Sequence, residues 1–356
     1  MTRDLKNSRL QKAVAAFDSH QIDALLVTRD PNITYLTEFP ASESWLLITP
    51  RRVFYLTDFR YVLEAKKNLK KEITVKHYQG SINEAACRLA HELKVKRLGI
   101  EEQHLTLSQY KLLKSKCPKS VNLVPTQKIV ENLREIKDQN EIGKIREALK
   151  IHHQTQSWLK KYLKSGLSEE KVLLELEHFV KSKGVGFSFD PIIASGPNSC
   201  YPHAKVTQRK ISQRDLVLVD MGIDYQGYKS DLTRLFFFGK IAPLIQEVHD
   251  CVYEAQQRAI AKVKAGQQIS EVDGAARNYL ASRKLAKFFG HALGHGVGLE
   301  IHESPRVSAQ NKSLLKENMV ITIEPAVYIP NKFGIRLEEM VLVKKDGCEV
   351  LSAHIN

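Results

Sequence analysis

The sequence lacks the features of a membrane protein, a disulfide-rich scaffold or a thiolate-bound metal site. No apolar run approaches the roughly 18 residues that suggest a membrane span. The first residues, MTRDLKNSRLQ, lack the apolar core of a signal peptide. The five cysteines are scattered, and none stands in a CxxC pair. We therefore expect a cytoplasmic protein with reduced thiols, no membrane partner and no thiolate zinc site.

The sequence also lacks an aromatic platform or a helix-turn-helix pattern for nucleic acid, although the chain is strongly basic. Its formal net charge is +14, from 54 lysines and arginines against 40 acids. The lysines are spread over helical segments such as KKNLKK and KVKR instead of forming one stripe. This pattern indicates a basic, solvated surface and no nucleic-acid partner.

What the sequence does contain is enough material for two globular domains. It has 356 residues, of which 43% are hydrophobic and 26% charged. After a helical opening over residues 5–20, strand-like runs alternate with helices near residues 82–93 and 107–115, with a turn at Pro31-Asn32. The runs are IDALLVT, WLLIT, RVFYLTD, EITVKHY, RLGIE and SVNLV. The alternation predicts an α/β domain over residues 1–125.

Residues 126–140 are polar and charged and are the expected linker to a second domain, residues 141–356. A long helix is predicted over residues 141–163, stopped by Gly166. Ser168 then caps a helix that ends at Gly184. LKSGLSEEKV at 163–172 is echoed by VKAGQQISEV at 263–272. This echo suggests an α+β domain built from two related halves.

Three histidines stand within twelve residues in the stretch GHALGHGVGLEIHESP, residues 290–305. A lone histidine is usually a satisfied core or surface residue. His291, His295 and His302 together, separated by glycines, indicate a site, but one that needs partners elsewhere in the chain.

Two carboxylates are expected side by side on one hairpin. The stretch LVLVDMGIDYQGYKSDLTRLFFF is strand-rich, and Gln226-Gly227 is a two-residue turn signal. With that turn, Asp220 faces Thr233, and Asp231 is the diagonal neighbour of Asp220. Carboxylates this close repel each other and lose solvation unless a cation is present. The alternative is that one of them sits exposed at the hairpin edge.

Two further acids stand in strand-like settings. Glu324 follows MVITI, and Glu338 lies in GIRLEEMVLV, where alternation puts Arg336, Glu338 and Met340 on one face. Each acid alone could be a surface residue. Four carboxylates would balance two divalent cations in a neutral cage around a bridging hydroxide. Oxygen-rich ligation favours manganese, cobalt or iron, and zinc is an alternative. The full set is Asp220, Asp231, His295, Glu324 and Glu338.

Five ordered motifs resemble those of the pita-bread metallopeptidases, in the branch of the Xaa-Pro aminopeptidases and prolidases. They are IIASGPNSCYPH, DMGIDYQGYKSDLTR, GHGVGLEIHESP, TIEPAVYIP and GIRLEE, and the resemblance covers residues 135–350. RLQKAVAAFDSHQIDALLVTRDPNITYLTEF and FYLTDFRYVLEAK resemble the creatinase-like amino-terminal domain of that branch. The implied fold is a creatinase-like α/β domain followed by a pita-bread α+β domain with two related halves.

The resemblance also implies roles for single residues. Glu324 would be the acid/base carboxylate. His291 and His302 would bind substrate and stabilise the tetrahedral oxygen, and His203 and Arg336 would belong to the substrate side. A homodimer is implied as well. The implied metal ligands are Asp220, Asp231, His295, Glu324 and Glu338.

The expected function is metal-dependent removal of an amino-terminal residue that precedes proline, as in an Xaa-Pro aminopeptidase acting on small peptides. A prolidase, which cleaves Xaa-Pro dipeptides, is the alternative. Arg306, in HESPRVS, could bind the free carboxylate of such a dipeptide. A metal-free pita-bread protein, of the creatinase type or a binding module, is a further alternative. Such proteins usually lack some of the five ligands.

Overall fold

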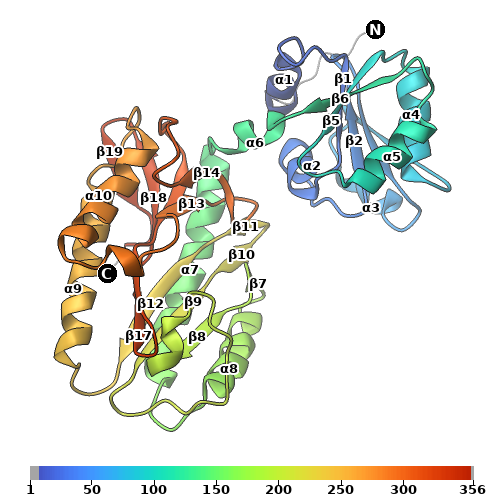
Figure 1. Cartoon of the computed structure of the whole chain (residues 1–356). Coiled ribbons are helices and arrows are strands. Elements are labelled where there is room, and N and C mark those ends of the chain that lie inside the picture. Colours follow the sequence, from blue (N-terminus) through green and yellow to red (C-terminus); the bar gives the residue numbers. More distant parts are fainter. Residues whose placement is uncertain (1–7, 354–356) are drawn as a thin grey trace. The chain divides into compact units, whose positions relative to one another are not determined.

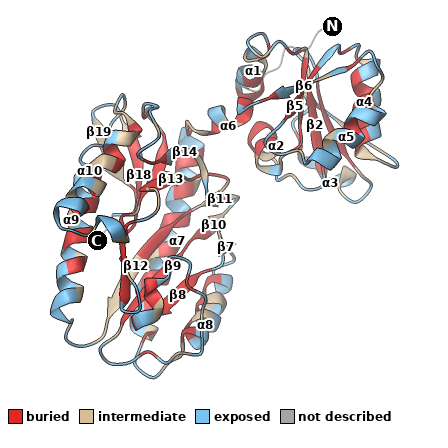
Figure 2. Ribbon diagram, viewed as in Figure 1, coloured by how far each residue is buried: buried red, intermediate tan, exposed pale blue. Residues whose placement is uncertain are grey.

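The computed structural model describes residues 8–353, and the chain divides into two compact units, Met1–Arg134 and Glu135–Asn356. Figure 1 shows each unit as a core of strands with helices packed against it. In both units the strands are largely buried and the outward faces of the helices are exposed (Figure 2). None of the helices within residues 8–353 is both long and apolar enough to cross a membrane.

The amino-terminal unit is built on a six-stranded mixed sheet in the order β4-β3-β2-β1-β5-β6. Every residue of β1, β2 and β3 is buried, which explains why these strands are continuous apolar runs. The strands are β1 (Ala24–Val27), β2 (Trp45–Ile48), β3 (Val53–Thr57), β4 (Ile73–His77), β5 (Arg97–Glu101) and β6 (Asn122–Thr126). All six overlap the predicted runs, and β6 lies two residues further along the chain than SVNLV.

Helices cover both faces of this sheet (Figure 1). Helices α4 and α5 share one apolar cluster with the strands, in which Leu89 and Leu113 are buried. On the other side, Leu10 of α1 and Leu36 of α2 are fully buried. The helices are α1 (Ser8–Ala15), α2 (Asp30–Thr37), α3 (Val62–Asn68), α4 (Ile82–Glu92), α5 (Leu107–Lys116) and α6 (Ile129–Arg134). The predictions for α4 and α5 are confirmed. Of the predicted opening helix, residues 5–7 lie outside the described residues, residues 8–15 form α1, and residues 16–20 form a turn instead.

Two expectations for this unit are wrong. Pro31-Asn32 begins helix α2 instead of forming a turn, because proline is tolerated in a first helical turn and Asn32 is held by Glu101 and Glu131. Cys87 and Cys117, 30 residues apart, form a disulfide where reduced thiols were expected. Helices α4 and α5 pack together and bring these two cysteines into contact.

The polar stretch expected as a linker, residues 126–140, contains α6.

The carboxyl-terminal unit has one helix pair in each half. The pairs are α7 (Gln139–Tyr162) with α8 (Glu169–Ser182), and α9 (Pro243–Ile260) with α10 (Ile269–Ser282). Asp138 caps α7 in a capping box with Glu141, and Ser168 caps α8 as predicted. Gly184 follows α8 with a φ of 73°, a conformation that favours glycine.

Two antiparallel sheets and two shorter groups of strands complete this unit. The first half has β12-β9-β8 and β11-β10-β7, and the second half has β14-β13-β15-β18-β19 and β16-β17. The elements are β7 (Gly186–Phe187), β8 (Ile192–Ser195), η1 (Gly196–Cys200), β9 (Leu216–Met221), β10 (Ile223–Tyr225), β11 (Tyr228–Lys229), β12 (Leu232–Phe237), η2 (Ala286–Phe288), β13 (Gly294–Gly296), β14 (Glu303–Val307), β15 (Val320–Ile323), β16 (Ala326–Ile329), β17 (Phe333–Arg336), β18 (Glu339–Lys344) and β19 (Gly347–Val350).

The two halves repeat each other in their backbone hydrogen bonds. Gly166 donates to the carbonyl of Ile211 (2.8 Å), and Gly266 donates to that of Leu315 (2.8 Å). Helices α7 and α8 pack on β8, β9 and β10 in one apolar cluster, whereas α9 and α10 pack on β15, β17 and β18 in another. The echo in the sequence therefore reflects two related halves, as predicted.

Candidate metal centre

The hairpin that carries two of the acids has the predicted register. Tyr225 pairs with Tyr228 across a two-residue turn in which Gln226 and Gly227 have φ values of 53° and 86°. Positive φ at both central residues matches the twist of the flanking strands. Further along, Thr233 on β12 pairs with Asp220 on β9. The turn therefore fixes which side chains lie beside Asp220, as the sequence predicts.

The other acids lie at strand ends in the second half. Glu324 directly follows β15, and its N–H donates to the carbonyl of Leu293 (2.8 Å). Glu338 directly precedes β18. The stretch GIRLEEMVLV is not one strand, because β17 pairs with β16 while β18 pairs with β15. The chain changes sheet at residues 337–338 and so turns Glu338 toward the hairpin acids.

The glycines around His295 allow close packing of neighbouring backbone. A Cβ atom on Gly294 would lie 2.1 Å from the carbonyl oxygen of Thr322, and one on Gly296 would lie 2.3 Å from that of Ser304. Strand β13 can therefore run between β14 and β15 only with glycine at these two positions. This packing holds His295 over the acids that adjoin β15 and β18.

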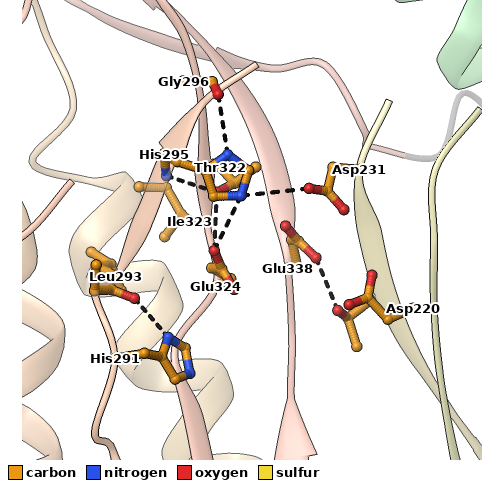
Figure 3. A network of polar contacts seen from close by, with 12 residues as sticks. Asp220, Asp231, His291, Leu293, His295, Gly296, Thr322, Ile323, Glu324 and Glu338 are labelled. Atoms are coloured by element: carbon orange, nitrogen blue, oxygen red, sulfur yellow. Dashed lines mark hydrogen bonds and ion pairs between the residues drawn. The ribbon is translucent and has the colours of Figure 1, made fainter. Parts of the chain in front are cut away.

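Four side chains point toward a common space (Figure 3). The Nε2 atom of His295 lies 3.5 Å from Oδ2 of Asp231 and 3.5 Å from Oε1 of Glu324. Ligand atoms of Asp231, His295 and Glu338 all lie within 4.8 Å of one another. The Nδ1 atom of His295 lies 3.1 Å from the carbonyl of Gly296, so this nitrogen is the donor and Nε2 faces the carboxylates as a bare ligand atom.

Crowding of buried acids changes their protonation. Burial, and next the charge of Glu338, raise the pKa values of Asp231 and Glu324 well above the ordinary range. Burial, and next Asp220, raise the pKa of Glu338 to about 8. Burial, with a further contribution from His302, lowers the pKa of His295 to about 4. In the metal-free chain these shifts favour the neutral forms of the three acids and of the imidazole.

Asp220 is linked to this group through a buried arginine. Arg336, 4% exposed, donates from Nη2 to Oδ2 of Asp220 (2.6 Å) and from Nε to Oγ1 of Thr233 (2.8 Å). Thr233 in turn donates to Oε2 of Glu338 (2.9 Å). The remaining nitrogen, Nη1, donates to Tyr328 and to the carbonyl of Pro202. Protein acceptors therefore engage all three guanidinium nitrogens.

His291 is fixed from behind by an ion pair on α10. Asp273, which is fully buried, pairs with Arg277 (2.7 Å), and Arg277 donates to the carbonyl of His291 (2.9 Å). The Nδ1 atom of His291 lies 2.7 Å from the carbonyl of Ala292 and must be its donor. Burial lowers the pKa of His291 to about 4. Its Nε2 is buried and accepts no hydrogen bond from the described residues, which leaves one unused acceptor.

The other predicted substrate residues lie at the exposed side of the group. The rings of His295 and His302 meet edge to face with centroids 4.2 Å apart, and His302 is exposed. His203 is exposed on the loop that follows η1. Arg306 is exposed on β14. The structure thus brings His302 next to the acid cluster, whereas Arg306 lies on the surface.

Sequence reasoning missed the residues that hold the site in place. Thr233 bridges Glu338 and Arg336, and the hydroxyl of Thr322 lies between the N–H of His295 (3.1 Å) and Glu324 (3.4 Å). A signal for Thr233 was present, since the predicted hairpin places it opposite Asp220. Nothing local marks Thr322, because His295 comes from another strand.

The donor set fits divalent metal ions. Three carboxylates with raised pKa values, on Asp231, Glu324 and Glu338, and one imidazole with a bare Nε2 form an acceptor-rich pocket, which is unfavourable without cations. Oδ1 of Asp220 is buried and has no hydrogen-bond partner among the described residues. Oxygen and imidazole ligands without thiolate suit manganese, cobalt, iron or zinc. Cations would remove the repulsion and use the unpaired oxygen.

Comparison with known proteins gives matches along nearly the whole chain. The profile of metallopeptidase family M24 matches residues 143–345, and that of the Creatinase/Prolidase N-terminal domain matches residues 9–136. The Xaa-Pro dipeptidase of Pyrococcus horikoshii is 34% identical over 98% of this chain and 98% of its own length. Two solved structures are also similar. The Xaa-Pro dipeptidase from Bacillus anthracis has a TM-score of 0.93 at 34% identity and covers 97% of each chain. The X-Pro aminopeptidase from Thermotoga maritima has a TM-score of 0.87 at 33% identity and covers 96% of this chain and 98% of its own.

Proposed function

Because this chain belongs to metallopeptidase family M24, we propose that it is a prolidase, an enzyme that hydrolyses Xaa-Pro dipeptides. The membership confirms the predicted fold, a creatinase-type amino-terminal domain followed by a pita-bread catalytic domain. It also removes the alternative of a metal-free binding protein, since the chain is a metallopeptidase. The observation that carries the proposal is the acid and histidine cluster within a chain that matches Xaa-Pro dipeptidases over nearly its whole length.

This assignment replaces the aminopeptidase that we expected from the sequence. Both whole-length matches named above as dipeptidases support the prolidase, whereas one structure of lower TM-score is an X-Pro aminopeptidase. Peptides with proline in the second position are the proposed substrates in either case. The two activities differ in whether a free carboxylate follows the proline.

We assign metal binding to the residues that converge on the common space. When bound, a pair of divalent ions would activate a water molecule as nucleophile and polarise the scissile carbonyl. Manganese is the proposed metal, because oxygen ligands dominate the set. Elemental analysis of protein purified without chelators tests the assignment. The proposed ligands are Asp220, Asp231, His295, Glu324 and Glu338.

Glu324 is the proposed proton carrier. Its side chain is 17% exposed, so its carboxyl group can reach both the buried acids and a substrate. In its ionised form this carboxylate can take a proton from the attacking water, and the raised pKa favours keeping that proton until it passes to the leaving proline nitrogen. Thr322, within 3.4 Å, keeps the carboxyl group in place during this transfer.

The histidines have different proposed roles because their free nitrogens differ. His302 is exposed beside His295, and burial with the nearby His203 lowers its pKa, which favours a neutral ring that donates one N–H to the substrate carbonyl oxygen. His291 uses Nδ1 on the backbone, and its bare Nε2 can only accept. We therefore assign His291 to binding a substrate donor instead of the developing oxyanion.

Proline selectivity follows from the substrate itself. An Xaa-Pro bond has no N–H and a fixed ring, so a rigid site need not supply an acceptor for the leaving nitrogen. The free carboxylate of the dipeptide requires a cation. Arg336 is engaged with protein acceptors, whereas the guanidinium of Arg306 is exposed and can approach a carboxylate in a bidentate manner.

The test compares kcat/KM for Ala-Pro and Ala-Pro-Ala in the manganese-loaded enzyme and in its Arg306→Ala variant. We expect the dipeptide to be preferred, and Arg306→Ala to lower kcat/KM for the dipeptide only. Preference for the tripeptide, unchanged in the variant, would establish the aminopeptidase instead. Light scattering on the same samples tests the homodimer that the family resemblance implies.

A further inference from the structure

A fully buried carboxylate outside the metal cluster accepts hydrogen bonds from both ends of one loop. Glu169, the first residue of α8, has no exposed surface. Its Oε1 accepts from the N–H (2.6 Å) and the hydroxyl (2.7 Å) of Ser195. Its Oε2 accepts from the side chain of Asn198 (2.9 Å) and from the N–H (3.0 Å) and hydroxyl (2.7 Å) of Thr207. One side chain thus fixes the start and the end of residues 196–206.

This loop carries groups that reach the site. The carbonyl of Pro202 accepts from Nη1 of Arg336 (3.1 Å), whose Nη2 holds Asp220. The next residue is His203. The position of the loop therefore sets the position of His203.

The second half of the unit shows that the fold itself does not need a carboxylate here. The N–H of Glu169 donates to the carbonyl of Arg209 (3.1 Å), and the N–H of Ile269 donates to that of Ser313 (3.0 Å). The matching bonds make Glu169 and Ile269 equivalent positions at the start of α8 and α10. Both side chains are fully buried. The second half has an apolar residue at this position, whereas the first half has a buried carboxylate, whose desolvation costs free energy.

We propose that Glu169 is a positioning residue for substrate binding, which holds the loop of residues 196–206 so that His203 faces the substrate. The inference rests on the proposed function, since it assigns His203 to the substrate side. Five donors converge on two oxygens. A carboxylate can accept them all, whereas the nitrogen of an amide would face donors with a donor.

The kinetic test uses Glu169→Gln, which keeps the volume of the side chain. We expect KM for Ala-Pro to rise on the order of tenfold or more, with a smaller change in kcat and unchanged metal content. The reason is that part of the substrate's binding free energy must then be used to order the loop. Glu169→Ile, which copies the second half, should fold and show the same rise in KM. Val172→Ala, a fully buried position on the same helix, is the control for lost stability and should leave KM unchanged.

Two further measurements make the outcome decisive. In a double-mutant cycle, His203→Ala should raise KM in the wild type but add little in Glu169→Gln, because the loop is already displaced. Additive effects, or a rise in KM for Val172→Ala of the same size as for Glu169→Gln, would overturn the proposal. Hydrogen exchange of residues 196–207 should quicken in Glu169→Gln and stay unchanged in α10. This readout needs no activity, so unchanged exchange refutes the positioning role, whereas an inactive wild type refutes only the proposed function.

Discussion

Replacing Glu338 with glutamine tests the crowded carboxylates in two opposite ways. Glu338 is 2% exposed and accepts from the hydroxyl of Thr233 (2.9 Å). The amide keeps the volume of the side chain and can still accept through its oxygen, but it removes one negative charge. In the metal-free protein this change relieves repulsion of Asp220. In the metal-loaded protein it removes a proposed ligand.

The size of the effect follows from the pKa of Glu338, which rises from 4.5 to about 8 in the folded chain. At about 1.4 kcal/mol per pKa unit, ionising this group costs the fold on the order of 5 kcal/mol at most. The folded state binds the proton more tightly than the unfolded state does. The cost is therefore absent below pH 4.5 and complete above pH 8, and metal-free stability falls as pH rises through this window.

Calorimetry of chelator-treated protein measures this difference. Glu338→Gln should melt close to wild type near pH 5, and at least several degrees above it near pH 8.5, since 1 kcal/mol is worth about 2–4 °C in a domain of this size. Glu349→Gln makes the same chemical change at an exposed acid paired with Arg146, and should show no such trend. With manganese present, Glu338→Gln should lose metal and nearly all activity. A variant with no pH-dependent gain in the metal-free state would refute the crowding.

Three other predictions follow from the same geometry. His302→Ala should keep its metal by elemental analysis and lose on the order of 10²-fold in kcat, because it removes a donor to the substrate carbonyl oxygen. His291→Ala, which removes an acceptor for the substrate, should also keep its metal but raise KM more than it lowers kcat. Metal loss in either variant as severe as in His295→Ala would contradict this division. Arg336→Met should weaken metal binding by about 10–100-fold, because Asp220 loses its partner, and excess manganese should restore activity. Calorimetric titration with manganese measures the affinity, and an affinity equal to that of the wild type would contradict this role. Metal binding at pH 7 should release protons, since the acids with raised pKa values must ionise, and affinity should therefore rise with pH; a pH-stat that records no release would contradict the raised values.

The hairpin illustrates what the sequence could predict. Turn chemistry at Gln226-Gly227 is local, and the period of two along a strand then fixes every pair beyond it. The opposition of Asp220 and Thr233 was predictable for this reason. Strands β1, β2 and β3 of the amino-terminal unit were predictable because burial on both faces leaves continuous apolar runs.

Contacts between distant segments could not be predicted in this way. Arg336 bonds Asp220, 116 residues away, although the sequence places it two residues from Glu338. Cys87 and Cys117 meet only because α4 and α5 pack together. The role of Glu169 is equally invisible, since a glutamate after a capping serine is ordinary at the start of a helix. In each case the partner is chosen by tertiary packing and carries no local signal.

The metal ligands are the central claim, and a crystal structure of the manganese-loaded protein with anomalous scattering tests them most directly. We predict anomalous peaks in the space enclosed by the five proposed ligands, two in number as in other two-metal sites. The same crystals grown with chelator should lose these peaks. Peaks bound by other residues, or no bound manganese in an active enzyme, would contradict the account. The five ligands in question are Asp220, Asp231, His295, Glu324 and Glu338.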